Sequence, residues 1–368
     1  MINNQLSPDN NINNNIHNNE DKNYENLNIF DLNFLPISQQ LKVKLDILEN
    51  KMLEITQLKS YMVYEDLIIN KTKSENYYIH YLHNKIIDPN KKNFIMLHGF
   101  RGYSYNFIGL IPGLHEKYNL FIPDIIGMGF SSRPQIKFTS NKQCMDFFIE
   151  SINQFICQLN INDFYLCGHS LGGTFAGNYA IKYPEKIIKV LLLSPAGISD
   201  MKIKDSNNES FFKDTKCYIS CVLRMGCCIK CCEPTIQDYY NNCLFKPIIK
   251  IIYRSVYWIK DDLLEVFGQL AELSMEFPTD LDKSIFYVLK TPFPMGSLPI
   301  EKEMLNNSKL NFVICFGEND WMDRIGCERL CKKCPERFKI FIISKRGHMF
   351  VLENSKELSK IICENFPI

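Results

Sequence analysis

The sequence predicts an α/β protein with a mostly parallel central sheet, helices on both faces and an inserted helical cap. Short runs rich in Ile, Val, Phe and Tyr alternate with amphipathic stretches. A Gly-x-Ser-x-Gly string stands between one such run and a helical stretch, and an acidic loop and a Gly-His pair follow the last two runs. Strands that alternate with helices in this way form parallel sheets, which bind ligands at the carboxyl ends of their strands.

The composition excludes several classes of protein. Basic and acidic side chains number 42 and 41, which gives a formal net charge of +1 and argues against a nucleic-acid partner. The 15 cysteines are odd in number, and no secretory leader pattern precedes them. No uninterrupted apolar run reaches the roughly 18 residues of a spanning helix. We therefore expect a cytoplasmic protein whose membrane contact, if any, is peripheral.

The chain divides into five predicted parts. The Asn-rich residues 1–28 are expected to form a disordered tail, because they carry few large apolar groups. Residues 29–60 hold a leading helical segment, with apolar side chains at helical spacing. Residues 61–199 and 304–368 form the two parts of the core. Between them, residues 200–303 lose the alternating rhythm and predict a cap or lid.

Seven apolar runs are predicted to be the strands of the core. They cover residues 77–82, 93–98, 120–123, 164–168, 190–194, 312–317 and 338–344.

The candidate nucleophile is Ser170, within the string Gly168-His169-Ser170-Leu171-Gly172. A serine on a sharp turn from strand to helix needs small neighbours, because side chains at Gly168 and Gly172 would collide with nearby backbone. The start of the following helix adds backbone N–H donors and a dipole that favours a developing anion.

Two backbone N–H groups are candidates for the oxyanion hole. One belongs to Leu171, which follows the nucleophile, and the other to Phe100, in the turn after residues 93–98. His98 precedes this turn, and we interpret its side chain as a structural histidine.

His348 is the candidate general base. It follows the last predicted strand, and the other six histidines all precede Ser170, whereas in this architecture the order along the chain is serine, acid, histidine. His348 would take the proton of Ser170 and return it to the leaving group.

The acid that orients His348 has three candidates in the loop after residues 312–317. Asp320 is preferred because it stands near the end of the strand. Asp323 is the alternative acid, although it also fits as the cap of a helix beginning near Arg324. Glu318 is the weakest choice.

Taken together, these motifs resemble the α/β-hydrolase superfamily over residues 77–368. The matching strings are His98-Gly99-Phe100, residues 124–134, residues 168–173, Tyr183-Pro184 and Gly347-His348. Residues 129–134, 168–173, 181–184 and 320–323 are also similar to the branch that contains phospholipid lipases and lysophosphatidic acid acyltransferases. That branch carries a His-x4-Asp string, but here Glu353 stands in place of the aspartate.

The resemblance implies a serine hydrolase that cleaves a carboxylic ester, of a lipid or lysophospholipid, through an acyl-enzyme on Ser170. An acyltransferase with the same triad and a non-catalytic lipid-binding regulator are the alternatives. No cofactor or metal is expected. Residues 124–134 contain only a Gly-x-Gly string followed by Pro134, so they do not predict a dinucleotide site.

Two features of the predicted cap suggest contact with lipid. The cysteine cluster of residues 227–232 has nearly contiguous thiols, which suits zinc poorly and leaves palmitoylation open. Residues 245–259 combine a basic stripe with a broad apolar face. That pattern fits a helix that covers an acyl pocket, and it also fits contact with a membrane surface.

Overall fold

The computed structural model describes residues 37–71, 76–200, 261–277, 281–290, 295–307, 309–353 and 356–368. The predicted tail, the cysteine cluster 227–232 and the amphipathic segment 245–259 lie outside the described residues. The chain divides into two compact units, Met1–Ile47 and Leu48–Ile368. Helix α1 (Ile37–Ile55) begins in the first unit and ends in the second, and its place agrees with the expected leading helix.

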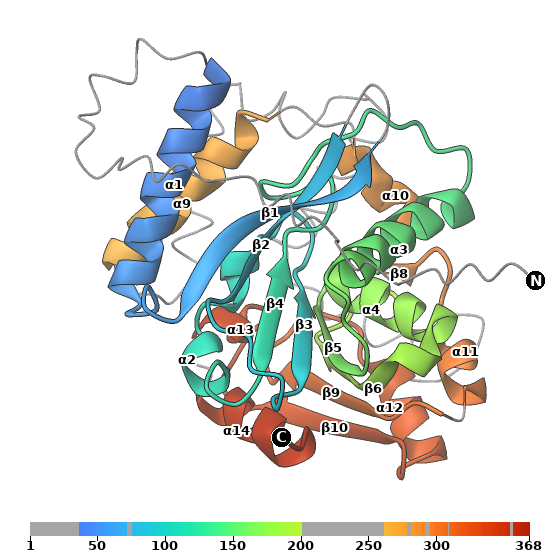
Figure 1. The fold of residues 1–368 in the computed structure, drawn as a ribbon. Helices are drawn as coiled ribbons and strands as arrows, with labels where there is room; N and C mark the ends of the chain where they lie inside the picture. The colour runs from blue at the N-terminus through green and yellow to red at the C-terminus, as the bar shows by residue number, and fades with distance from the viewer. Residues whose placement is uncertain are drawn as a thin grey trace, which may run out of the picture. The chain divides into compact units, whose positions relative to one another are not determined.

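The second unit is built on an eight-stranded sheet with the order β1-β2-β4-β3-β5-β6-β9-β10 (Figure 1). Strand β2 pairs antiparallel with both of its neighbours, and all pairs from β4 to β10 are parallel. This arrangement confirms the predicted mostly parallel sheet. The strands are β1 (Met62–Lys71), β2 (Asn76–Asn84), β3 (Asn93–Leu97), β4 (Asn119–Pro123), β5 (Phe164–His169), β6 (Ile187–Leu193), β9 (Phe312–Gly317) and β10 (Phe338–Ile343).

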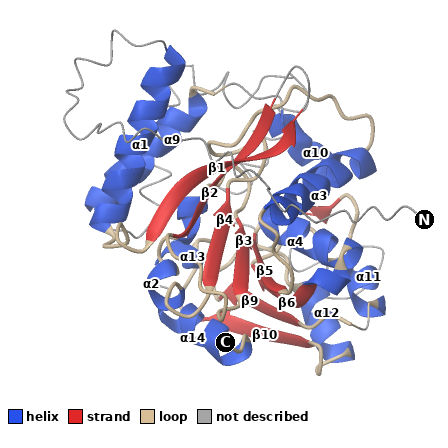
Figure 2. Ribbon diagram, in the orientation of Figure 1, coloured by secondary structure: helices blue, strands red, loops and turns tan. Residues whose placement is uncertain are grey.

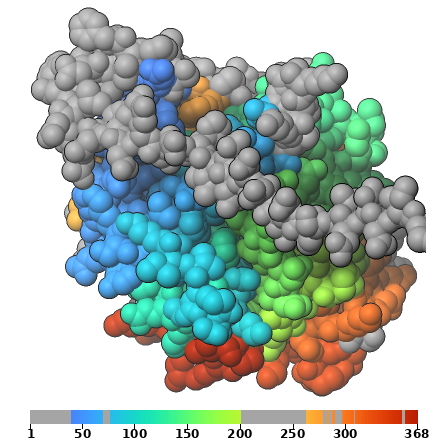
Figure 3. Space-filling model, in the orientation of Figure 1, coloured from blue at the N-terminus to red at the C-terminus, as the bar shows by residue number. Residues whose placement is uncertain are grey.

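Helices lie on both faces of the sheet (Figure 2). Helices α3, α4 and α12 cover one face, and α2 and α14 cover the other. In the space-filling view, green residues, the colour of α3 and α4, lie beside the cyan residues between β2 and β4 (Figure 3). The helix bounds are α2 (Ile111–Leu114), α3 (Asn141–Gln158), α4 (Leu171–Lys182), α11 (Glu301–Asn306), α12 (Ile325–Lys333), α13 (Phe350–Glu353) and α14 (Lys356–Asn365).

The core forms because the central strands are apolar along their whole length. Every residue of β4, β5 and β9 is buried, as expected for parallel strands covered by helices on both faces. Helix α3 shows the complementary pattern, because Cys144, Phe148 and Ile152 recur every four residues and are buried. Among the described residues, no helix is long and apolar enough to cross a membrane.

The predicted cap is described only in part. Its described elements are α9 (Asp261–Met275), α10 (Ile285–Val288) and a small antiparallel pair, β7 (Leu289–Lys290) with β8 (Met295–Gly296). Helix α10 packs on α3. The boundaries of the cap, at residues 200 and 303, stay a prediction.

An ion triad centred on the buried His80 joins α1 to the sheet edge. His80 of β2 is almost fully buried, with Nε2 2.7 Å from Glu49 Oε1 and Nδ1 2.6 Å from Asp66 Oδ1. An ionised carboxylate can only accept a hydrogen bond, so both ring nitrogens of His80 carry a proton and donate it. Burial alone would lower the pKa of His80, but the charge of Glu49 and the hydrogen bonds that the ring donates to both carboxylates outweigh it and raise this pKa to about 10.

We expect this triad to make stability depend on alkaline pH. The raised pKa means that the native state holds a proton that the unfolded chain releases above about 6.5, so the stabilisation is complete below that pH and is lost toward pH 10. Between pH 6.5 and 9.5 the free energy of unfolding should fall by about 3 kcal/mol because His80 loses its proton. Urea unfolding followed by circular dichroism measures the free energy of unfolding at each pH, and His80→Gln should remove this part of its pH dependence. The same pH dependence in the two proteins would show that His80 is not the titrating group.

Candidate active site

Ser170 sits on a strained turn between β5 and α4. Its backbone dihedrals are φ 55° and ψ −119°, a region that non-glycine residues rarely adopt. Three backbone hydrogen bonds hold it there. The Ser170 N–H donates to the carbonyl of Leu193 at 2.9 Å, and the Ser170 carbonyl accepts from Gly173 at 3.0 Å and from Ala196 at 2.9 Å.

The glycines of the turn are required by close backbone contacts. A Cβ atom on Gly168 would overlap the carbonyl of Gly172, and one on Gly172 would overlap the carbonyls of Leu97 and His98. The start of α4 therefore lies directly against the end of β3. These are the collisions expected from the sequence motif.

His348 and Asp320 are brought together from the loops after β10 and β9. Nδ1 of His348 donates to Oδ1 of Asp320 at 3.0 Å. The Asp320 side chain is only 2% exposed, and its carboxylate also accepts from the Ser194 hydroxyl and the Met322 backbone N–H. Burial alone would raise the pKa of Asp320, but His348 and these two donors outweigh it, so this pKa lies below its ordinary value. Asp320 is thus ionised at neutral pH and fixes the orientation of the imidazole.

The two other acid candidates lie in different contacts. Asp323 Oδ1 accepts from the Ile325 N–H at 2.9 Å, so it contacts the start of α12, but the N-cap position itself is held by Arg324. Glu318 accepts from the Lys345 backbone N–H at 2.7 Å. Of the three acids, the structure places only Asp320 against His348. Glu353 is in α13, and its side chain is outside the described part of the chain.

His169 links the serine turn to the loop of His348, a role that sequence reasoning missed. Its Nε2–H donates to the backbone carbonyl of His348 at 2.9 Å, and the two imidazole centroids are 4.9 Å apart. Burial lowers the pKa of His169, and the charge of the nearby His348 lowers it further, to about 3. The ring therefore stays neutral and keeps this tautomer. No spacing in the sequence signals the contact, because the partners are 179 residues apart.

The candidate oxyanion loop lies beside Ser170. A Cβ on Gly99 would approach the Ser170 Cβ to 3.0 Å, and Phe100 follows directly in the chain. His98 braces this loop, because its Nε2 accepts from the Ile125 N–H at 2.8 Å and its Nδ1 donates to the Gly99 carbonyl at 2.8 Å. Burial lowers the pKa of His98, as the neutral form requires. Its side chain therefore has the structural role inferred from the sequence.

Metal binding has no support from the described residues, which hold no cluster of three or more His, Cys, Asp or Glu side chains suited to an ion. Cys327 is fully buried in the core, and Cys331 and Cys334 pack against it. Burial raises the pKa of Cys331 to about 11. These three thiols serve as small apolar side chains.

Comparison with known proteins relates these features to a family. The family model for the alpha/beta hydrolase fold matches residues 92–215. A probable 1-acylglycerol-3-phosphate O-acyltransferase of Oryza sativa subsp. japonica is 31% identical over 287 residues, which cover 73% of this chain and 65% of the rice protein. Human 1-acylglycerol-3-phosphate O-acyltransferase ABHD5 is 34% identical over 115 residues, 30% of this chain and 32% of the human protein. The mouse (lyso)-N-acylphosphatidylethanolamine lipase is 34% identical over 114 residues, 30% of this chain and 33% of the mouse protein. The chain thus spans less than two thirds of the length of each of these relatives.

Solved structures show the same fold. A bacterial membrane phospholipase A superposes with a TM-score of 0.59 at 18% identity, covering 87% of this chain and 90% of that one. Carboxylesterase CesB of Bacillus subtilis gives a TM-score of 0.57 at 15% identity, covering 88% and 97%. The sheet order, the serine turn between β5 and α4 and these matches agree. Together they show that the chain has the α/β-hydrolase fold.

Proposed function

We propose that this protein is a serine hydrolase that cleaves a carboxylic ester of a lipid or lysophospholipid through an acyl-enzyme on Ser170. One observation carries the proposal. The residue before Ser170, His169, binds the backbone of His348, and His348 in turn binds the ionised Asp320. These contacts support the proposal, because nucleophilic catalysis requires a serine, an imidazole and a carboxylate close to one another.

In the proposed reaction the Ser170 hydroxyl oxygen attacks the ester carbonyl while Nε2 of His348 takes its proton. Asp320 holds Nδ1–H of His348 and stabilises the imidazolium. The backbone N–H groups of Phe100 and Leu171 stabilise the oxyanion. The imidazolium then protonates the alcohol oxygen as the ester bond breaks. The alcohol departs, and the acyl group remains bound to the Ser170 oxygen. A water molecule, deprotonated by His348, then attacks the carbonyl of the acyl-enzyme. His348 returns this proton to the Ser170 oxygen as the acyl bond breaks, which releases the fatty acid and restores the Ser170 hydroxyl.

The lipid substrate class is supported by the relatives. The rice and human proteins are named for acyl transfer to 1-acylglycerol-3-phosphate, and the mouse protein is named as a lipase. These names also favour a second candidate function, in which an alcohol such as lysophosphatidic acid replaces water as the acceptor. Peripheral contact with a membrane through residues 245–259 stays a prediction of the sequence.

The products of the reaction separate the two functions. Purified protein is given an acyl ester, with and without lysophosphatidic acid, and the products are identified by mass spectrometry. We expect free fatty acid in both mixtures and none above background with Ser170→Ala. Phosphatidic acid as the main product would instead establish acyl transfer. Equal product from wild type and a folded Ser170→Ala variant would refute both functions.

The acid is tested by a matched pair of variants. Asp320→Asn removes the charge that orients His348, so kcat should fall by about 10⁴, as expected when the acid of such a triad is lost. Asp323→Asn changes a carboxylate three residues away that contacts the start of α12, so kcat should stay within a few-fold of the wild-type value. Ester hydrolysis is measured for both, with circular dichroism as the control for folding. A larger loss in Asp323→Asn would reassign the acid.

A further inference from the structure

The oxyanion turn, residues 99–102, fixes the direction of the candidate donor Phe100 N–H. The Gly99 carbonyl accepts from the Gly102 N–H at 2.9 Å and from Nδ1 of His98 at 2.8 Å. This carbonyl and the Phe100 N–H belong to one planar trans peptide, so they point in opposite directions. Any contact that holds the turn therefore also aims the Phe100 N–H.

The oxyanion turn contains a strained residue. The φ angle of Arg101 is 50°, in the left-handed region that non-glycine residues rarely adopt. Arg101 is the third of the four residues in the turn, and turns with a positive φ at this position favour glycine. Such strain persists only where the surrounding structure fixes it. The turn therefore depends on support from outside residues 99–102.

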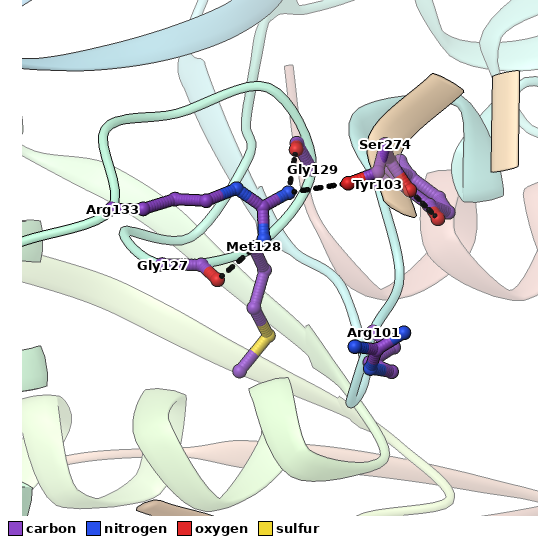
Figure 4. A pocket seen from close by; sticks show the side chains of 7 residues that line it. All are labelled: Arg101, Tyr103, Gly127, Met128, Gly129, Arg133 and Ser274. Carbon is purple, nitrogen blue, oxygen red and sulfur yellow. Dashed lines mark hydrogen bonds between the residues drawn. The ribbon is translucent and has the colours of Figure 1, made fainter. Parts of the chain in front are cut away.

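The end of helix α9, in the predicted cap, contacts the oxyanion turn and the residue that follows it. The Tyr103 hydroxyl oxygen lies 2.5 Å from Oγ of Ser274 (Figure 4). Ser274 donates its own hydroxyl proton to the Ala271 carbonyl at 2.9 Å, so Tyr103 is the donor in this contact. Nη1 of Arg101 contacts the sulfur of Met275. Tyr103, Ser274 and Met275 are all buried.

Two further contacts fix α9 on the core. The ring of Phe267 meets the ring of Tyr105 edge to face, with 4.6 Å between the ring centroids. Arg133 donates to the backbone carbonyls of Ser274 at 3.2 Å and Gly129 at 2.6 Å (Figure 4). Helix α9 is thus attached both to the loop after β3, which carries the oxyanion turn, and to the loop after β4.

We propose that the end of α9 holds the oxyanion turn in the conformation that points the Phe100 N–H at the reacting carbonyl. Tyr103 and Ser274 are then positioning residues, which act on catalysis through the turn. This inference rests on the proposed function, because it assigns a role in stabilising the oxyanion formed at Ser170. It also gives the predicted cap a part in the chemical steps, since a displacement of α9 would misalign the donor.

Hydrolysis of p-nitrophenyl butyrate by the full-length protein tests the positioning role. Tyr103→Phe and Ser274→Ala each remove the hydrogen bond between α9 and the loop after β3. We expect kcat to fall about tenfold in each, less than the roughly 10²–10³ lost with a whole oxyanion donor, because the Phe100 N–H is misaligned rather than removed. KM should stay within about twofold, because the oxyanion forms in both acylation and deacylation. The double variant should be no slower than the slower single variant, since both changes break one link.

A second buried serine of the predicted cap provides the matched control. Ser284, in the 3₁₀ helix Leu281–Ser284, also donates to the backbone carbonyl three residues before it. Ser284→Ala should therefore keep kcat within about twofold of the wild-type value. Circular dichroism checks the folding of each variant. Tyr103→Phe keeps the aromatic ring, so it tests the hydrogen bond even if Ser274→Ala does not fold.

Inhibition by an alkyl trifluoromethyl ketone reports on the oxyanion hole alone. The Ser170 oxygen adds to the ketone carbon, its proton passes to His348, and the ketone oxygen becomes a stable oxyanion. The inhibition constant should rise about tenfold in Tyr103→Phe and Ser274→Ala, in step with the fall in kcat, because the inhibitor resembles the transition state. An unchanged inhibition constant, or a kcat within twofold of wild type in both folded variants, would overturn the proposal.

Hydrogen–deuterium exchange separates this inference from the proposed function, because it needs no substrate. The peptide that contains residues 99–102 should exchange faster in Ser274→Ala than in the wild type or Ser284→Ala. A wild type that hydrolyses esters, with folded variants that are equally active and equally protected, would keep the proposed function and refute the role of α9. A wild type that hydrolyses no ester would refute the proposed function and the positioning role together, even if the exchange shows that α9 holds the turn.

Discussion

The strained backbone at Ser170 is the constraint on which the rest of the site depends. A non-glycine residue in such a conformation costs on the order of 1–3 kcal/mol, and it persists only where its surroundings fix it. Here β6 and the loop after it supply two of the fixing hydrogen bonds, to Leu193 and from Ala196. Gly168 and Gly172 permit the close packing of β3, β5 and α4. The position of β5 between β3 and β6 is therefore what makes the serine turn possible.

The remaining groups of the site reach Ser170 through neighbouring strand ends. Strands β9 and β10 follow β6 in the sheet, so the loops that carry Asp320 and His348 emerge at the same edge. Ser194, at the end of β6, holds the Asp320 carboxylate, and His169, at the end of β5, holds the backbone of His348.

Much of this architecture could be predicted from the sequence because it depends on local patterns. Apolar runs predicted seven strands, and the spacing of Gly168 and Gly172 predicted the serine turn. Asp323 could be distinguished from Asp320 because it fitted a position at the start of a helix. Strand β1 was missed because Glu65 and Asp66 interrupt its apolar alternation. The contacts of His169, Ser194 and His80 could not be predicted either. Their partners lie 179, 126 and 31 residues away in the sequence. Only the order of the strands and the packing of the helices bring these residues into contact.

The central claim is that Ser170 is an activated nucleophile. Covalent labelling with a fluorophosphonate probe, followed by intact-mass analysis and peptide mapping, tests it without any assumption about the substrate. The account predicts one adduct on the wild-type protein, located at Ser170, and loss of labelling in both Ser170→Ala and His348→Ala. A folded wild-type protein that takes up no probe, or an adduct at a different residue, would contradict the account and favour a lipid-binding protein that keeps the fold without the chemistry.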